Sequence, residues 1–275
     1  MRKLRRLWTA LICLIVPSFL KPPLLRLAGH RVHQTARIRC SLILADRLYM
    51  GRGTRIGRFN GIKVRRLVMR NGAYIGHLNW ISGGLSIGLL EHGAIGHLNI
   101  VNSSMLAGCR RRPQLRLGVG SKITAGHFVN VCETTTLGNY TTIAGFGSQL
   151  WTHGFVHHSE GPGRGEVRGR ITIGDNVYIG SNCTLQPGIT IANAVSVGAH
   201  ASVAKSLLEP GVYVPQTLRY LARSPEERLA GLDRIATGSL EPAAYYWRDG
   251  GGQLIDGGLA PPISAPSVDA GNSAS

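Results

Sequence analysis

Histidines recur in this sequence inside a short repeated motif. The pentapeptide IGHLN occupies residues 75–79 and 95–99, and AGH at residues 125–127 repeats its start. If the motif returns on successive coils of a solenoid, the three histidines stand in one column at the same corner. Zinc needs ligands that converge on one ion at ~2.0–2.1 Å. Neighbouring parallel strands lie ~4.8 Å apart, so a straight column is poorly aimed at one metal and no metal site is expected.

A second group of histidines lies within residues 125–180. His153 follows Thr152 directly, and His157 and His158 come shortly afterwards in a glycine-rich stretch. Histidine changes its charge near neutral pH, which makes these side chains candidates for proton transfer. The surrounding elements must hold one of the rings beside a substrate.

The elements that position these residues follow a period of six. Each hexad begins with an aliphatic residue, usually followed by Gly or Ala, and six is neither the 3.6 of a helix nor the 2 of a simple strand. It is the repeat of a parallel β-helix, in which a short strand and a tight turn recur. Stacked coils bury the aliphatic positions on one another, so no single repeat is stable alone. The uninterrupted hexads are Ile173-Gly174, Ile179-Gly180, Leu185-Gln186, Ile191-Ala192, Val197-Gly198 and Val203-Ala204.

The same period extends towards the N-terminus, with single-residue slips of the kind that turn insertions produce. With three hexads in each coil, Asn79 and Asn99 would occupy an inward slot and pair amide to amide. Aliphatic anchors in the register of the later hexads fall at Val119, Ala125, Val131, Leu137 and Ile143.

The sequence therefore predicts one elongated all-β solenoid domain with additional segments at its ends. Its 275 residues are 43% apolar and include 37 Gly, which suits a narrow coil with sharp corners. We expect the solenoid over residues 31–215, interrupted by loops at 102–118 and 149–172. Residues 216–249 predict short C-terminal helices, because an acidic first turn follows a Ser-Pro start. Residues 250–275 are rich in Gly, Pro, Ser and Ala and predict a disordered tail.

The positive charge of the chain is concentrated at one end. Residues 1–70 hold 17 of the 31 Lys and Arg and one acidic residue, Asp46, which gives +16 of the total +17. Such a surface binds anions. Residues 1–30 combine basic side chains with an apolar run broken by Pro17, shorter than the ~20 residues of a spanning helix. This composition favours an amphipathic helix that binds an anionic membrane surface over a segment that binds nucleic acid. The alternative is a helix that caps the open end of the solenoid. The two roles are compatible.

The cysteines indicate a reducing compartment. There are five of them, an odd number, and none forms a CxxC pair. Together with the basic N-terminal segment, they predict a cytoplasmic protein that is peripheral on the inner face of the cytoplasmic membrane.

The segment around Thr152-His153 carries a resemblance to a known family. The stretch TTIAGFGSQLW precedes it, and ITIGDNVYIGSNCTLQPGITI follows from residue 171. This order resembles the hexapeptide-repeat acyltransferases, which fold as a left-handed parallel β-helix. The similarity is greatest to the sugar O-acetyltransferase branch of the galactoside, maltose, capsule and lipopolysaccharide acetyltransferases. The coils match over residues 32–215, and the Thr-His loop followed by IGDNVYIGSN is the specific part, because zinc γ-carbonic anhydrases share the hexads.

The resemblance implies roles for individual residues. His153 would be the general base that takes a proton from an acceptor hydroxyl as its oxygen attacks the thioester of acetyl-CoA. Asn130 would hold the acceptor or orient the imidazole, and His127 lies near it in the sequence. Relatives often have Asp in about this place, for which Glu133 is a possible substitute.

The resemblance also implies where acetyl-CoA binds. In the family it lies in the groove between subunits of a homotrimer, along the C-terminal coils. By position, the cofactor-binding residues would be Gly180, Ser181, Ala199, Ala201 and Lys205, with Lys205 meeting the phosphates.

The resulting hypothesis is an acetyl-CoA-dependent O-acetyltransferase that modifies a sugar in cell-surface polysaccharide or lipopolysaccharide biosynthesis. Its partners would be a sugar or lipid-linked glycan acceptor and the membrane surface. One alternative is a γ-carbonic-anhydrase-like zinc protein. The other is a non-catalytic, membrane-associated β-helical scaffold.

Overall fold

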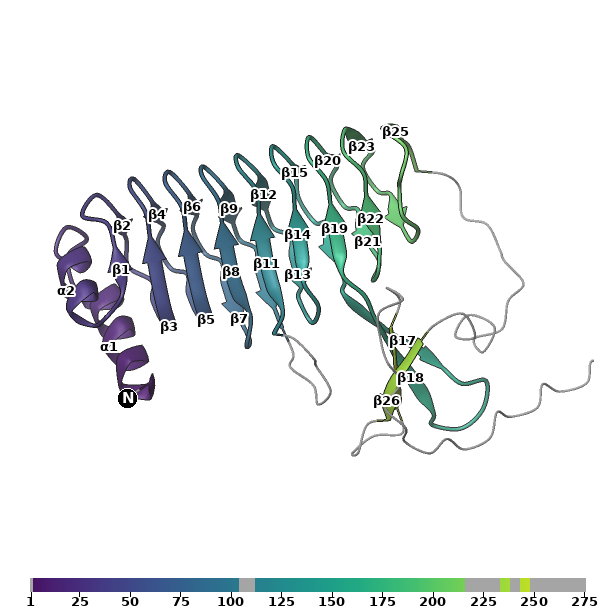
Figure 1. Cartoon of the computed structure of the whole chain (residues 1–275), viewed down its shortest axis with the longest axis horizontal. Coiled ribbons are helices and arrows are strands. Elements are labelled where there is room, and N and C mark those ends of the chain that lie inside the picture. The colour runs from purple at the N-terminus through teal and green to yellow at the C-terminus, as the bar shows by residue number, and fades with distance from the viewer. Residues whose placement is uncertain (1, 104–111, 216–232, 238–242, 248–275) are drawn as a thin grey trace, which may run out of the picture.

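The computed structural model describes residues 2–103, 112–215, 233–237 and 243–247. Within residues 31–103 and 112–215 the chain forms coils that stack along one axis, with two helices at the N-terminal end of the stack (Figure 1). Neighbouring coils pair through parallel strands, so this is the parallel β-solenoid of the left-handed type that the resemblance implied.

Three faces surround the axis. Face 1 is the sheet of β2 (Arg37–Ile38), β4 (Arg55–Ile56), β6 (Tyr74–Ile75), β9 (Ala94–His97), β12 (Lys122–Ala125), β15 (Thr142–Ile143), β20 (Tyr178–Ile179), β23 (Val195–Val197) and β25 (Gly211–Tyr213). Face 2 holds β7 (Trp80–Ser82), β10 (Ile100–Asn102), β13 (Phe128–Asn130), β16 (Gln149–Leu150), β21 (Thr184–Leu185) and β24 (Ser202–Val203). Face 3 holds β8 (Ser86–Leu89), β11 (Gln114–Leu117), β14 (Thr135–Leu137), β19 (Ile171–Ile173) and β22 (Thr190–Ile191). The longer strands β3 (Leu42–Met50) and β5 (Gly61–Met69) join faces 2 and 3, and β1 (Arg31–Val32) pairs with β3.

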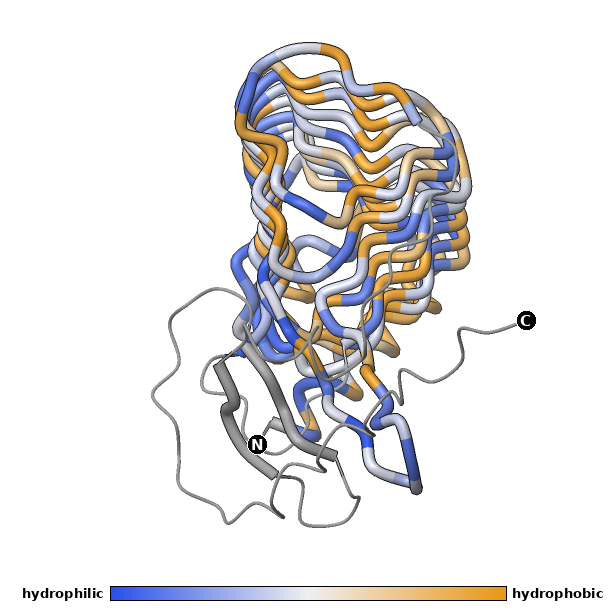
Figure 2. The backbone as a smooth tube through the Cα atoms, turned by 90° about the vertical axis from the view of Figure 1, so that its right-hand side faces the viewer, coloured by the Kyte–Doolittle hydropathy of each residue, from blue (hydrophilic) through white to orange (hydrophobic). Residues whose placement is uncertain are grey.

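The coil repeat confirms three hexads per turn. On face 1, Ile38 pairs with Ile56, Ile56 with Ile75 and Ile75 with Ile95, at separations of 18, 19 and 20 residues. These isoleucines are at most 1% exposed and point into the core. Viewed along the stack in Figure 2, the apolar positions of successive coils lie over one another. The hydrophobic core is therefore a set of continuous aliphatic columns.

Three predicted anchors, Val119, Ala125 and Val131, are wrong by two residues. The positions that pair with neighbouring coils are Leu117, Ile123 and Val129. Ile123, not Ala125, pairs with Ile95 and Ile143 and is fully buried, whereas Ala125 pairs with His97 and is half-buried. Side chains alternate along a strand, so positions two apart lie on the same side until the chain turns a corner. The six-residue period therefore does not distinguish them.

A column of inward polar side chains follows the corner between faces 1 and 2. Asn79 donates its amide to Oδ1 of Asn60 at 2.9 Å, and Asn99 donates to Oδ1 of Asn79 at 3.1 Å. The amide-to-amide ladder predicted for Asn79 and Asn99 is thus confirmed, and it begins earlier. Backbone N–H groups of each coil bond to the previous side chain, which satisfies donors that the corner would otherwise bury. The full column is Ser41, Asn60, Asn79, Asn99, His127, Ser148 and Cys183.

Both predicted loops are shorter than expected, the first at its C-terminal end and the second at both ends, where β16 and β19 belong to the coil. Gln114–Leu117 belongs to face 3 as β11, so the first excursion leaves the coil only between Asn102 and Gln114; residues 104–111 lie outside the described part. The second excursion is a regular antiparallel hairpin of β17 (His153–His157) and β18 (Arg164–Arg168) between β16 and β19 (Figure 1). Its regular strands give His153 a defined place.

The expected C-terminal helices are corrected where the chain is described. β26 (Asp233–Thr237) and β27 (Ala243–Trp247) are strands, and β27 pairs in parallel with β18 of the hairpin. The free edge of β18 offers pairing partners that local propensity does not reveal. The rest of 216–249 and the predicted tail 250–275 lie outside the described residues.

The N-terminal segment caps the solenoid. α1 (Arg2–Ile15) and α2 (Lys21–Leu27) bury Cys13 and Leu25 completely, and Nζ of Lys21 donates to the carbonyl of Cys13 at 2.5 Å. Arg6 pairs with Asp46 of β3 at 2.5 Å. Within the described residues, no helix combines the length and apolar character that crossing a bilayer requires.

Candidate active site

His153 lies where the hairpin leaves the corner between faces 2 and 3. The preceding Thr152 is fully buried and fixes this corner. Its Oγ1 accepts the backbone N–H groups of Cys132 at 2.8 Å and Glu133 at 3.1 Å, and it donates to Asn130 at 3.0 Å. These bonds tie the start of β17 to the previous coil and hold the His153 backbone in place.

The ring of His153 is oriented by Asn130. Nδ1 of His153 lies 2.9 Å from Oδ1 of Asn130, and Nδ2 of Asn130 donates to Oδ1 of Asn102 at 3.0 Å. Because Nδ2 is turned towards Asn102, the oxygen of Asn130 faces the imidazole. An amide oxygen only accepts hydrogen bonds, so the neutral ring carries its proton on Nδ1 and its lone pair on Nε2. That tautomer is the one a general base needs for proton abstraction through Nε2.

Charged and polar neighbours set the pKa of His153. Burial lowers this pKa, but a hydrogen bond and the charge of Cys132, together with the charge of Glu166, outweigh burial, while Arg168 opposes them. The net direction is a pKa above the ordinary value of histidine. Nε of Arg168 pairs with Glu166 at 2.8 Å, and both side chains are almost fully buried. The hairpin thus brings a buried ion pair beside the base.

Two aromatic rings lie beside the imidazole. The ring centroids of Trp151 and Phe155 lie 6.1 Å and 5.8 Å from that of His153, both edge to face. Phe128 packs on Trp151 at 4.8 Å, and Phe155 is 44% exposed. The candidate base therefore sits between apolar surfaces that remain accessible to a ligand.

The expected column of three histidines is corrected by the coil register. His77 and His97 do stack, with centroids 5.2 Å apart, but the vertical neighbour of His97 is Ala125. His127 instead takes the slot equivalent to Asn99, because Ile123 starts its motif two residues earlier than the sequence repeat suggests. Within the described residues, no group of three or more His, Cys, Asp or Glu is placed to hold a metal ion.

His127 is a structural member of the polar column. Its Nδ1 accepts the backbone N–H of Ser148 at 3.1 Å, so Nε2 carries the proton and lies 2.9 Å from Oγ1 of Thr124. Burial lowers the pKa of His127 to about 4, against the backbone hydrogen bonds to Ser148 and Gly145, which raise it. Both ring nitrogens are engaged inside the coil, so the structure gives His127 no position from which to act on a substrate.

The predicted cofactor-binding residues separate into two places. Gly180, Ser181 and Ala199 lie at the corner between faces 1 and 2, where a Cβ on Gly180 would stand 2.7 Å from the backbone N of Ala199. Gly180 is thus required for coil packing. Ala201 is 8% exposed and belongs to the core, whereas Lys205 is exposed and follows β24, at the same corner as the hairpin.

Several site residues were missed by reasoning from the sequence. Cys132, Glu166 and Arg168 reach His153 through the corner and the hairpin, and Asn102 orients Asn130 from the coil before. The signal that could have found Asn102 is its place directly after Val101, as Asn130 follows Val129 on the next coil. His157 and His158 are exposed towards the hairpin turn.

The fold and the site together define a β-helix built of hexapeptide repeats with a histidine held at one corner. Residues 170–205 match the family described as Bacterial transferase hexapeptide (six repeats). The Bifunctional protein GlmU of Ralstonia pickettii (strain 12J) is 36% identical over 53 residues, which are 19% of this chain and 12% of that relative. The chain thus covers a small part of the curated relative. Over residues 170–205 this chain therefore carries the hexapeptide repeat described for bacterial transferases.

Proposed function

We propose that this protein is an acetyl-CoA-dependent O-acetyltransferase that acts on a sugar hydroxyl during the synthesis of a cell-surface polysaccharide or lipopolysaccharide. The observation that carries the proposal is the hydrogen bond from Nδ1 of His153 to Oδ1 of Asn130, which leaves the basic lone pair on Nε2. A hydroxyl acceptor needs such a base, whereas a thioester donor is already activated for attack.

The proposed reaction proceeds by direct attack. Nε2 of His153 removes the hydroxyl proton while the oxygen bonds to the thioester carbonyl carbon. The carbon–sulfur bond then breaks, and the proton passes from Nε2 to the leaving thiolate. A positioned base contributes typically ~10²–10⁴-fold to such a rate. Asn130 keeps the correct tautomer, and the raised pKa of His153 strengthens it as a proton acceptor.

The surroundings of His153 suit a sugar ring. Trp151 and Phe155 place aromatic rings beside the base, and the guanidinium of Arg164 lies over the Phe155 ring, 4.8 Å from its centroid, as a donor for sugar hydroxyls. The exposed Lys205 lies two coils further along the corner from which the hairpin leaves, and in this proposal it meets phosphates of the donor. The order along this corner supports a donor that approaches from the C-terminal coils.

An exposed apolar strip on face 2 and its edge supports the expected homotrimer. Six large side chains, each at least 45% exposed, follow successive coils there: Phe59, Leu78, Trp80, Leu98, Ile100 and Phe146. Monomeric proteins rarely expose apolar patches of this extent. A second copy of the chain would cover the strip and complete a donor groove between subunits.

The test is release of free CoA thiol from acetyl-CoA in the presence of a panel of sugar acceptors. We expect turnover by the wild type, loss of at least ~10²-fold in His153→Ala, and little change in the matched control His157→Ala on the exposed end of the same strand. Full activity of His153→Ala would refute the role of this base. If wild type shows no turnover but hydrates CO₂ and is inactivated by a chelator, the zinc alternative replaces the proposal. If neither activity is found, the non-catalytic scaffold alternative replaces the proposal.

A further inference from the structure

The outer face of the N-terminal cap is apolar. α1 and α2 turn Cys13 and Leu25 towards the solenoid and leave most of their other large apolar side chains in solvent. Some of them line a groove of about 650 Å³ between the two helices. Two short helices with this much exposed apolar surface indicate an interaction site. The exposed side chains are Leu4, Leu7, Trp8, Leu11, Leu14, Ile15, Phe19, Leu20 and Leu27.

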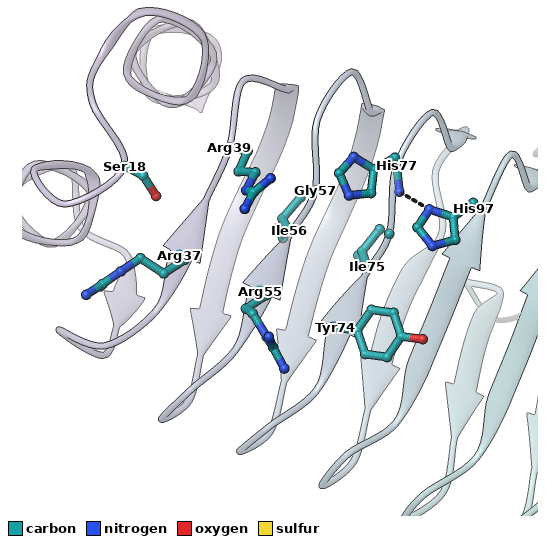
Figure 3. A pocket seen from close by; sticks show the side chains of 11 residues that line it. Ser18, Arg37, Arg39, Arg55, Ile56, Gly57, Tyr74, Ile75, His77 and His97 are labelled. Carbon is teal, nitrogen blue, oxygen red and sulfur yellow. Dashed lines mark hydrogen bonds between the residues drawn. The ribbon is translucent and has the colours of Figure 1, made fainter.

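A basic groove of about 540 Å³ adjoins this cap on face 1. Figure 3 shows Arg37, Arg39 and Arg55 on the first coils, next to Ser18 from the connection between α1 and α2. Among the described residues, no acidic side chain lines the groove. A second basic cavity of about 760 Å³ lies on face 3 near the same end and is lined by five arginines: Arg5, Arg31, Arg47, Arg66 and Arg70.

Two histidines complete the groove in Figure 3 as outward donors. Nδ1 of His77 accepts the backbone N–H of Arg58 at 3.2 Å, and Nδ1 of His97 accepts that of His77 at 3.1 Å. Each neutral ring therefore carries its proton on Nε2, away from the coil. Burial, His97 and the arginines Arg39 and Arg58 lower the pKa of His77, which disfavours a charge on this ring.

We propose that the cap and the arginine groove beside it form one docking surface for an anionic lipid bilayer. The apolar face of α1 and α2 lies among the upper acyl chains, and Arg37, Arg39 and Arg55 bind headgroup phosphates. The apolar face of the cap matches the acyl-chain layer of a membrane, and the arginine groove matches its anionic headgroup layer. Face-to-face packing of two caps would instead bring the arginine clusters of both copies together, and a nucleic acid would leave the apolar face uncovered.

The docking surface is separate from the candidate active site. On face 1, β2 and β15 are five strand steps apart, which at ~4.8 Å per step is roughly 24 Å. His153 follows the coil that contains β15. Vesicle binding and acyl transfer to a water-soluble acceptor are therefore measured independently, and failure of one leaves the other standing.

The test is co-sedimentation of the full chain with lipid vesicles. We expect binding to vesicles of phosphatidylglycerol and phosphatidylcholine, weak binding to phosphatidylcholine alone, and weakening by salt. Changing Arg37, Arg39 and Arg55 to Gln should weaken binding roughly fivefold for each arginine removed. The matched control Arg116→Gln/Lys122→Gln removes two exposed basic residues of later coils and should bind as wild type. If the control lost as much vesicle binding for each basic residue removed, the role of the groove would be overturned, because binding would then depend on net charge alone.

A second variant tests the apolar face. Trp8→Ser/Leu27→Ser changes two exposed side chains and should abolish sedimentation with either vesicle while leaving the thermal unfolding midpoint close to that of wild type. Brominated lipids should quench the fluorescence of wild type more than that of Trp8→Phe. Unchanged vesicle binding of the Trp8→Ser/Leu27→Ser variant would overturn the proposal. The proposal would also be overturned if the variant lost self-association in sedimentation velocity and kept vesicle binding, because a second copy of the chain would then cover the apolar face.

Discussion

Nδ1 of His153 and Oδ1 of Asn130 lie 2.9 Å apart, although 23 residues separate them in the chain. β13, which ends at Asn130, pairs with β16, which ends just before Trp151, so the two residues stand on successive coils. The bond depends on the coil register and on Asn102, which turns the Asn130 amide. One slip of the register would separate the imidazole from its orienting group.

Asn130→Ala should reduce acyl transfer by roughly 10–100-fold, because the ring loses the acceptor that keeps its proton on Nδ1. Asn130→Asp should retain more activity, because a carboxylate also accepts from Nδ1–H. Steady-state kinetics of the two variants beside wild type check this. Equal activity of Asn130→Ala and wild type would show that the ring does not depend on this bond.

The pH dependence of kcat/KM should reflect the raised pKa of His153. The base works when neutral, so activity should fall as the pH falls through a midpoint above the ordinary ~6.5 of histidine. Glu166→Gln removes one negative charge that raises this pKa and should move the acid limb to lower pH. If Glu166→Gln still unfolds cooperatively but leaves the pH profile unchanged, the assignment of the acid limb to His153 is contradicted.

Acid should destabilise the folded chain through two buried histidines. Burial lowers the pKa of His127 to about 4, and burial together with Arg5 lowers that of His30 to about 4. The unfolded chain, with pKa ~6.5, then binds protons first as the pH falls. The stability they contribute is complete above pH ~6.5 and is lost as the pH falls towards 4. Urea unfolding across this range measures the loss.

The ladder role of His127 predicts which replacement is tolerated. His127→Asn restores the side chain that Asn60, Asn79 and Asn99 place in earlier coils and should keep most of the stability. His127→Leu leaves the backbone N–H of Ser148 without its acceptor and should cost about 1–3 kcal/mol in the free energy of unfolding. Both variants should keep the kcat of wild type where folded. A large kcat loss in stable His127→Asn would instead make His127 part of the chemistry.

Lys205 tests the proposed donor groove. Lys205→Ala should raise KM for acetyl-CoA roughly fivefold with kcat nearly unchanged, as expected for an exposed charge that meets a phosphate. Lys122→Ala, an exposed lysine on face 1, is the matched control. Identical KM values for the two variants would place the donor elsewhere.

The amino-acid sequence by itself determined the architecture, and its resemblance to the hexapeptide-repeat acyltransferases singled out His153 as the candidate base. The six-residue period dictates stacked coils, since only that repeat buries every aliphatic anchor, and Thr152-His153 marks the place where the chain leaves the stack. The Asn79–Asn99 ladder was likewise predictable, because identical motifs on successive coils must stack.

Only the tertiary structure decided the register between coils and the residues that surround His153. Residues two apart in a strand face the same side, so the period could not choose between Ile123 and Ala125, and it placed His127 in the wrong column. The hairpin brings Glu166 and Arg168 to His153, and β27 forms a strand because β18 presents an open edge. These contacts join residues far apart in sequence, and their physical cause is the pairing of one coil with the next, which no local pattern encodes.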